Sequence, residues 1–293
     1  MGVFLFRRTL TARSATLDDQ PAIAALSRSD ARVHVHLDWQ SAEDWLGEQP
    51  FLVAERSKHL MGMLACPPAP PDTAWVRVFA LYGNTSAEEV WRLLWPQARE
   101  ALEAMGAEQV AGLSLDDWID PLYLASGFKH THSVVVLTRS ADPAPRAPAA
   151  SPARIRPAVS ADHETLVAVD SAAFQPPWQI SAAIARRAMA LACWLTVAEI
   201  DGQIVGYQLT TPTPGGVHLA RLAVRPEWQG RGVGAALVVD MIEACRRQGA
   251  HDFTVNTQDT NAASLAVYKR LGYRLNGTSY PVYQLPLKDN VKI

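Results

Sequence analysis

The chain of 293 residues exceeds the length of one typical domain and suits two domains of similar size. Its formal net charge of −2 excludes bulk electrostatic attraction to nucleic acid, so we expect no nucleic-acid partner. No apolar run approaches the roughly 18 residues of a membrane span, and the N-terminal residues lack the charge order of a signal peptide, so we expect a cytoplasmic protein that does not bind a membrane.

The chain is divided near its middle by a segment that cannot form a core. Residues 141–153 contain four prolines, six alanines and no large apolar side chain. This composition favours an extended linker. We therefore predict a first domain over residues 1–140 and a second over residues 154–293.

The two halves of the chain repeat each other. Matching segments occur in the same order at offsets of 143, 144 and 145 residues. Three ordered matches with so little drift indicate a duplicated domain. The matching pairs are Asp19 with Asp162, Val53–Glu55 with Val197–Glu199, and Tyr123–Phe128 with Tyr268–Tyr273.

Each half is expected to form a helix, a hairpin, a strand, a long helix, a strand, a shorter helix and final strands. This order predicts an α/β fold with a mixed sheet. The pattern is clearest in the second half, where apolar residues from Leu237 to Cys245 follow helical spacing. The elements expected there are strands at 194–199, 203–210, 217–224, 253–256 and 280–287, a helix from near Gly232 to just before Gly249, and a helix from Asn261 to Gly272.

A loop with three glycines at every second position, Gly230, Gly232 and Gly234, lies between the strand that ends at Val224 and the long helix. A helix N-terminus presents unpaired N–H groups and a positive dipole end, and glycines let an anion reach them. We therefore predict a phosphate-binding loop, with a tight turn that needs glycine only for its dihedrals as the alternative. The chain after the loop is too short for a dinucleotide-binding fold, and the Gly-Lys-Ser/Thr of a Walker A loop is absent.

The segment Gln229-Gly-Arg-Gly232-Val-Gly234 resembles the acetyl-CoA pyrophosphate loop, Q/R-x-x-G-x-G/A, of the GNAT family of N-acetyltransferases. The resemblance extends to Leu222-Ala223-Val224 before the loop and to Asn261, Tyr268 and Gly272-Tyr273 after it. With the internal repeat, it implies two tandem GNAT acyltransferase folds.

The resemblance implies acetyl-CoA as cosubstrate. The backbone of Leu222–Val224 would pair with the pantetheine arm, the amides from Gly230 to Ala235 would bind the diphosphate, and Arg231 would contact a neighbouring phosphate. Asn261 would contact the cofactor, cap the following helix, or do both. The implied cofactor-binding residues are Leu222, Ala223, Val224, Gln229, Gly230, Arg231, Gly232, Val233, Gly234, Ala235, Asn261 and Tyr268.

For the chemistry, the resemblance implies that Tyr268 is the general acid for the departing thiolate. A backbone amide of a bulged strand near Val224 would stabilise the oxyanion. Tyr268 also fits an apolar helix face, and its counterpart Tyr123 lies in a half without the glycine loop, so part of its role is expected to be structural.

The general base is left open by the sequence. Asn256 stands where relatives that resemble ribosomal-protein N-terminal acetyltransferases have a glutamate, and it cannot take a proton at neutral pH. His218 stands where relatives that resemble histone acetyltransferases have a glutamate, and imidazole suits the task. A water chain from Glu199 is the further candidate.

In the first half, an offset of 144 residues aligns Thr85–Val90 with the glycine loop. Ser86 and Glu89 form a capping-box pattern, and Glu88 and Glu89 would oppose a diphosphate. We therefore expect acetyl-CoA to bind in the second half alone, with the first half in a supporting role.

The predicted function is transfer of an acetyl group from acetyl-CoA to a primary amine of a small molecule or peptide, in a ternary complex. The alternative is a non-catalytic module that binds or senses acetyl-CoA. We expect a monomer or homodimer and no metal site. The three cysteines, Cys66, Cys193 and Cys245, lie far apart without metal-ligand spacing and are expected to be buried apolar residues.

Overall fold

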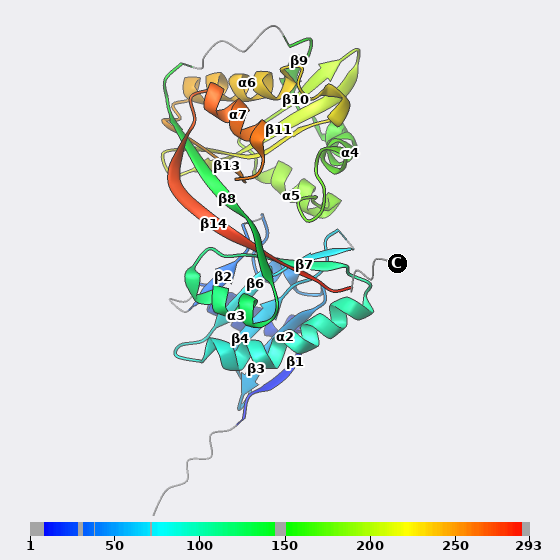
Figure 1. Cartoon of the computed structure of the whole chain (residues 1–293), viewed down its shortest axis with the longest axis vertical. Helices are drawn as coiled ribbons and strands as arrows, with labels where there is room; N and C mark the ends of the chain where they lie inside the picture. The colour runs from blue at the N-terminus through cyan, green and yellow to red at the C-terminus, as the bar shows by residue number, and fades with distance from the viewer. Residues whose placement is uncertain (1–8, 29–31, 38, 71, 144–150, 289–293) are drawn as a thin grey trace, which may run out of the picture. The chain divides into compact units, whose positions relative to one another are not determined.

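The computed structural model describes residues 9–28, 32–37, 39–70, 72–143 and 151–288 (Figure 1). Most of the predicted linker, residues 144–150, therefore lies outside the described residues. The chain forms two compact units, Met1–Thr131 with Val282–Ile293, and His132–Pro281. Each unit combines helices with strands in the expected α/β manner.

The last strands of the two halves are exchanged, so the predicted boundaries at 1–140 and 154–293 are corrected. Strand β8 (Lys129–Ser140) belongs to the first half in sequence but pairs antiparallel with β13 (Asp252–Gln258) of the second unit. Strand β14 (Arg274–Pro286) ends by pairing antiparallel with β7 (Gln109–Leu113) of the first unit. A repeat predicts that strands form, but it does not say which copy they join.

The first unit, called unit 1, contains an antiparallel sheet in the order β1-β3-β4-β6-β2. Strand β7 pairs in parallel with β5 and antiparallel with the end of β14. Its elements are β1 (Thr11–Ser14), α1 (Gln20–Ser27), β2 (Val33–Val35), β3 (Phe51–Arg56), β4 (His59–Ala65), β5 (Thr73–Trp75), β6 (Val78–Leu81), α2 (Ala87–Ala104), β7 and α3 (Asp120–Ala125).

The core of unit 1 is rich in aromatic residues packed under α2. Trp91 and Trp95 of this helix stack with ring centroids 5.3 Å apart. Tyr123, which matches Tyr268 in the repeat, is fully buried, and a Cβ at Gly112 would collide with its ring. Tyr123 therefore has a packing role in this unit.

The second unit, called unit 2, contains strands in the order β8-β13-β12-β11-β10-β9. The predicted helical residues from Leu237 to Cys245 place their apolar side chains in the core, and the helix stops before Gly249 at φ +91°. Its further elements are β9 (Arg154–Pro157), α4 (His163–Ala173), α5 (Ala182–Leu191), β10 (Trp194–Ile200), β11 (Gln203–Thr213), β12 (Gly216–Val224), α6 (Val233–Arg247) and α7 (Ala262–Arg270).

The parallel strands β12 and β13 pair along only part of their length. Their register joins Gly216–Leu219 to Asp252–Val255. Beyond Leu219, β12 continues with β11 as its partner, and a register shift between Leu209 and Thr210 leaves Ala220 as a bulge. The expected bulge of this strand thus lies four residues before Val224. The edge of β12 after the bulge is not paired by β13.

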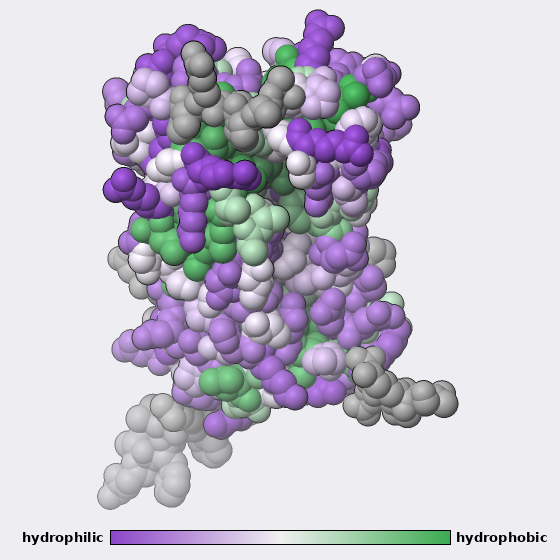
Figure 2. Space-filling model, turned by 45° about the horizontal axis from the view of Figure 1, so that its top comes forward, coloured by the Kyte–Doolittle hydropathy of each residue, from purple (hydrophilic) through white to green (hydrophobic). Residues whose placement is uncertain are grey.

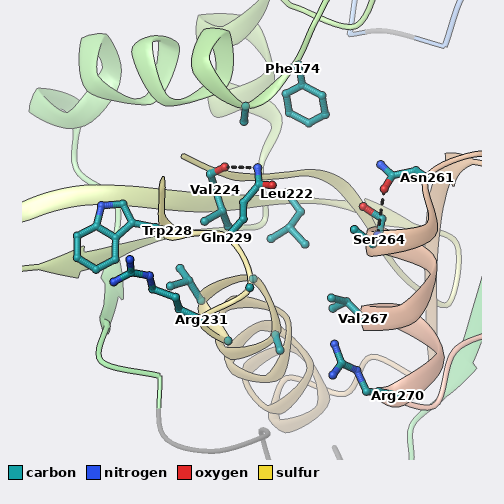
Figure 3. A pocket seen from close by; sticks show the side chains of 17 residues that line it. Phe174, Leu222, Val224, Trp228, Gln229, Arg231, Asn261, Ser264, Val267 and Arg270 are labelled. Atoms are coloured by element: carbon teal, nitrogen blue, oxygen red, sulfur yellow. Dashed lines mark hydrogen bonds between the residues drawn. The ribbon is translucent and has the colours of Figure 1, made fainter. Parts of the chain in front are cut away.

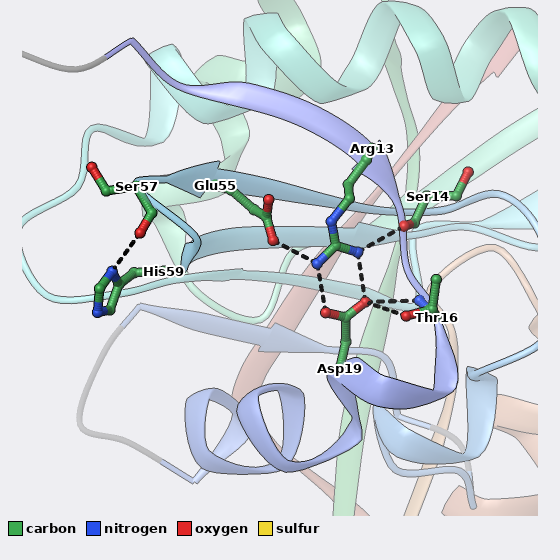
Figure 4. Close-up of polar contacts among 7 residues, drawn as sticks. All are labelled: Arg13, Ser14, Thr16, Asp19, Glu55, Ser57 and His59. Carbon is green, nitrogen blue, oxygen red and sulfur yellow. Dashed lines mark hydrogen bonds and ion pairs between the residues drawn. The ribbon is translucent and has the colours of Figure 1, made fainter.

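One polar cluster is present in both units. In unit 1, Arg13 donates to both carboxylate oxygens of Asp19 at 2.6 and 2.7 Å and also binds Glu55 (Figure 4). In unit 2, Arg156 forms the corresponding contacts with Asp162 and Glu199. The cluster joins the first strand, the start of the first helix and a hairpin strand in each unit.

The molecular face in Figure 2 is mostly hydrophilic, with apolar residues gathered in limited patches. In the part of the chain that the structure describes, no helix is long and apolar enough to cross a membrane.

Candidate active site

A cavity of about 550 Å³ opens in unit 2 where β12 separates from β13. This volume is within the range of small-molecule sites. Figure 3 shows Phe174 on one side of the β12 edge and the start of α6 on the other, with α7 closing a third side. The lining residues are Ala173, Phe174, Leu222, Val224, Trp228, Gln229, Gly230, Arg231, Gly232, Val233, Gly234, Ala235, Asn261, Ala263, Ser264, Val267 and Arg270.

The glycine loop adopts a conformation that requires glycine at two positions. Gly230 and Gly232 have φ of 73° and 79°, in the left-handed region. Gly232 is the N-cap of α6, and the first intrahelical bond runs from the Ala236 amide to the Gly232 carbonyl. Because Gly232 has no side chain, the amides of the first turn have no side-chain cap and meet the cavity.

Gly234 lies in the first turn of α6 with ordinary helical backbone. A Cβ there would make only ordinary contacts, at 3.7 Å from Val224 and 3.8 Å from Leu222. The fold of the protein itself therefore does not require glycine at this position. The space that Gly234 leaves belongs to the cavity.

The charge of the cavity is positive. Among the described residues that line it, two are arginines, Arg231 and Arg270, and none is acidic. The guanidinium carbon of Arg231 lies 4.8 Å from the ring centroid of Trp228. Figure 3 shows these two side chains near each other. Together with the dipole of α6, these cations favour an anionic ligand.

Two predicted cofactor-binding residues have structural hydrogen bonds. The Gln229 side chain donates to the Val224 carbonyl at 2.9 Å and ties the loop to the end of β12. The Asn261 side chain accepts from the Ser264 amide at 3.0 Å, which confirms it as the N-cap of α7. Both residues also line the cavity.

The predicted residues on β12 divide between its two faces. Leu222 and Val224 line the cavity, whereas the side chain of Ala223 is buried on the other face. The backbone of this segment keeps its unpaired edge toward the gap between β12 and β13. An extended ligand could add to this edge as a strand does.

Tyr268 and His218 lie outside the residues that line the cavity. Tyr268 is 4% exposed, and burial raises the pKa of its hydroxyl above the ordinary value of 10. Nδ1 of His218 lies 2.8 Å from the Thr254 hydroxyl, and burial lowers the pKa of the imidazole. Their catalytic roles stay predictions.

Glu199 is held in a structural cluster. Its carboxylate accepts a bond of 2.9 Å from Arg156, and it does not line the cavity described above. The same arrangement occurs around Glu55, in the unit without the glycine loop. A feature that both units share is expected of a contact that supports the fold, and the water chain from Glu199 stays a prediction.

Unit 1 differs from the predicted loop alignment. Five residues separate β6 from α2, whereas eight separate β12 from α6. The comparison of Thr85–Val90 with the glycine loop at a constant offset is therefore wrong, because the loop of unit 1 is shorter. Ser86 is the N-cap of α2, and its hydroxyl accepts from the Glu89 amide at 3.3 Å, as the capping pattern predicts.

Several lining residues were not predicted from the sequence. Phe174 follows the end of α4, and Val267 and Arg270 lie on α7. Arg270 could have been found from its place two helical turns after Ala263 and one turn after Val267, on the same face of α7. Phe174 carried no local signal, because its neighbours in the cavity are distant in sequence.

The cysteines fall into two groups. Cys66 and Cys245 are buried as predicted, whereas Cys193 is exposed just before β10, contrary to the prediction. No cysteine is among the lining residues of the described cavity. Within the described ranges, no group of three or more His, Cys, Asp or Glu side chains could hold a metal ion.

Comparisons with known proteins agree with this geometry. A model of the acetyltransferase (GNAT) family matches residues 163–273. An uncharacterised N-acetyltransferase of Methanocaldococcus jannaschii is 31% identical over 121 residues, which are 41% of this chain and 77% of that protein. The L-amino acid N-acetyltransferase of Escherichia coli (strain K12) is 38% identical over 90 residues, 28% of this chain and about half, 54%, of that enzyme.

A solved structure extends the similarity to nearly the whole chain. A tandem GNAT protein from the clavulanic acid biosynthesis pathway has a TM-score of 0.65 at 16% identity, with coverage of 96% of this chain and 99% of that chain. At this identity the likeness concerns the fold. The expected pair of tandem folds is thus found in a single solved chain of nearly matching extent.

Proposed function

The chain belongs to the GNAT family of N-acetyltransferases, and from this premise we propose that it transfers an acetyl group from acetyl-CoA to a primary amine of a small molecule or peptide. The observation that carries the proposal is the open first turn of α6, with glycines at Gly230 and Gly232, beside Arg231 and Arg270. Amide donors, a helix dipole and two cations suit a diphosphate.

The residues present fit acetyl-CoA at both ends. The amides of Gly230–Ala235 would hold the diphosphate, and the two arginines would neutralise phosphate charge. The unpaired edge of Leu222–Val224 would hold the amides of the pantetheine arm in the manner of an added strand. The bound cosubstrate would supply the acetyl thioester.

Tyr268 is the candidate proton donor. Because burial raises its pKa, the phenol remains protonated at neutral pH and keeps a proton available at its hydroxyl oxygen.

His218 remains the candidate proton acceptor. Its lowered pKa keeps the imidazole neutral at neutral pH, which is the form that accepts a proton. Direct attack by the amine, in a ternary complex, agrees with the cavity, because no cysteine among its described lining residues offers a covalent route.

The acceptor class is proposed from the relatives. The matched Escherichia coli enzyme is named for L-amino acids, so free amino acids are the first acceptors to test. The relatives named as N-acetyltransferases favour an enzyme over a non-catalytic sensor.

The test measures turnover of acetyl-CoA with a panel of L-amino acids, aliphatic amines, amino sugars and short peptides. The release of the free CoA thiol reports the reaction. We expect amine-dependent release with at least one class and an acetylated amine by mass spectrometry. Tight binding of acetyl-CoA without amine-dependent turnover across the panel would favour the sensor instead.

A further inference from the structure

A second polar cluster in unit 2 lies next to the cavity. Asp170 of α4 is 1% exposed and accepts two bonds of 2.7 Å from Nε and Nη2 of Arg221. The hydroxyl of Tyr207 donates to the same carboxylate at 2.7 Å. We call Asp170, Tyr207 and Arg221 the Asp–Arg–Tyr cluster.

The cluster also contacts the chain that follows α4. Nη2 of Arg221 donates to the Trp178 carbonyl at 2.6 Å. The guanidinium carbon lies 3.7 Å from the ring centroid of Phe174. A single side chain on β12 thus holds Asp170, Phe174 and the backbone at Trp178.

Stability alone does not explain the cluster. A buried ion pair loses hydration, and apolar residues of similar volume often serve the fold equally well or better. The strand registers and the start of the repeat place Ser27, Met63 and Val78 of unit 1 where unit 2 has Asp170, Tyr207 and Arg221. Unit 1 therefore forms the helix and the two strands that carry these positions without these charges, although the chain after that helix forms β2 in unit 1 and α5 in unit 2.

The contrast with the shared cluster is informative. The Arg13 and Arg156 clusters are present in both units, as a fold requirement would be. Among the described residues, the Asp–Arg–Tyr cluster is present in the unit with the glycine loop and not in the other unit. Its retention is therefore tied to the site in that unit.

The cluster lies between two sides of the cavity, the β12 edge and Phe174. Arg221 immediately precedes Leu222, the first residue of the cavity edge, and follows the bulge at Ala220. Phe174 lines the opposite side of the cavity, across the gap shown in Figure 3. The cluster connects the two sides of the cavity through charge-assisted bonds of defined direction.

We propose that Arg221 and Asp170 are positioning residues for acetyl transfer, which hold Phe174 and the Leu222–Val224 edge at a fixed separation. This inference rests on the proposed function. A shift of about 1 Å between reacting groups can lower a rate about 100-fold, while the distant diphosphate contacts remain intact. The cluster should therefore affect kcat much more than the affinity for acetyl-CoA.

The test uses an apolar triple variant of the full chain, Asp170→Leu with Tyr207→Phe and Arg221→Met. Removing all three polar groups avoids the uncompensated buried carboxylate that Arg221→Met alone would leave. We expect kcat to fall roughly 100-fold, with the Kd for acetyl-CoA within about threefold of the wild type. Arg221→Lys, which keeps the charge but loses the planar fork, should have an intermediate kcat.

The matched control is Arg13→Met with Asp19→Asn, which removes a bidentate pair of similar form from unit 1. It should leave kcat within about twofold after correction for the folded fraction measured by circular dichroism. Equal losses of kcat in this control and in the triple variant would show a general effect on folding and overturn the proposal.

Two other results would also overturn it. One is a triple variant with wild-type kcat, and the other is a parallel loss of acetyl-CoA affinity that accounts for the whole effect. A wild-type protein that acetylates no amine would instead refute the proposed function. Failure of the proposed function is distinguishable from failure of this inference, because it is seen with the wild-type protein before any substitution is made.

Discussion

Ser86 and Gly232 are the N-caps of the corresponding helices α2 and α6, but only Ser86 has a side chain that binds a first-turn amide. The Ser86 hydroxyl accepts a hydrogen bond from the Glu89 amide at 3.3 Å. Gly232 has no side chain, and the amides that follow it border the cavity. The first turn of α2 thus has a side-chain cap on one amide, and the first turn of α6 has no side-chain cap.

Gly234→Glu separates ligand binding from folding. The helical backbone at Gly234 accepts a side chain, and a carboxylate in the first turn of α6 favours the helix dipole. We expect a melting temperature equal to or above that of the wild type. Charge repulsion and blocked amides should weaken acetyl-CoA binding by roughly 3 kcal/mol or more, measured by calorimetry.

Gly232→Glu, the substitution that the loop pattern first suggests, is a less selective probe. Its φ of 79° is unfavourable for any side chain, so a loss of binding there would combine strain with charge. Binding by Gly234→Glu within about tenfold of the wild type would contradict the anion site at α6.

The two arginines should carry phosphate charge. Arg231→Ala and Arg270→Ala are each expected to weaken acetyl-CoA binding by roughly 1.5–3 kcal/mol. Both side chains are exposed, so the contribution should decrease as salt increases. Titrations at two salt concentrations would measure this, and Arg99→Ala on the exposed face of α2 is the control that should leave binding unchanged.

Tyr268→Phe tests the proposed acid. Loss of the hydroxyl should reduce kcat by roughly 10²–10⁴ while the KM for acetyl-CoA and the melting temperature change little. Tyr123→Phe is the control, since its buried hydroxyl has no partner among the described residues and its loss should not destabilise unit 1. Similar activity losses in both variants would show that Tyr268 is only a packing residue.

Unit 1 should lose stability in mild acid because of His34. Burial lowers the pKa of His34 to about 4, from 6.5, so the folded form resists a proton that the unfolded chain binds. The stabilisation is therefore complete above pH 6.5 and is lost as the pH falls toward 4.

The size of this effect should be up to about 3 kcal/mol. Urea unfolding of the wild type and of His34→Gln at pH 7 and pH 5 would measure it. The variant should lose less stability between the two pH values. An identical pH dependence in both proteins would contradict this origin.

The local parts of the site could be predicted from the sequence because their signals are local. The glycine loop, the N-cap at Asn261 and the apolar face of α6 each occupy one short segment, and the structure confirms their conformations. The chemistry of the loop follows from general properties of helix N-termini.

The remaining features depend on contacts between distant segments. The exchange of β8 and β14 could not be predicted, because both copies of the repeat offer similar strand partners. Phe174 reaches the cavity only through the packing of α4 against the sheet. The pairing of Glu199 with Arg156, which assigns it to a structural cluster, becomes visible only when β9 and β10 are aligned.

Calorimetric titration of the full chain with acetyl-CoA tests the central claim most directly. The open first turn of α6, set against the capped first turn of α2, predicts one binding site per chain. Binding at two equivalent sites, or no binding at all, would contradict the assignment of the acetyl-CoA site to unit 2.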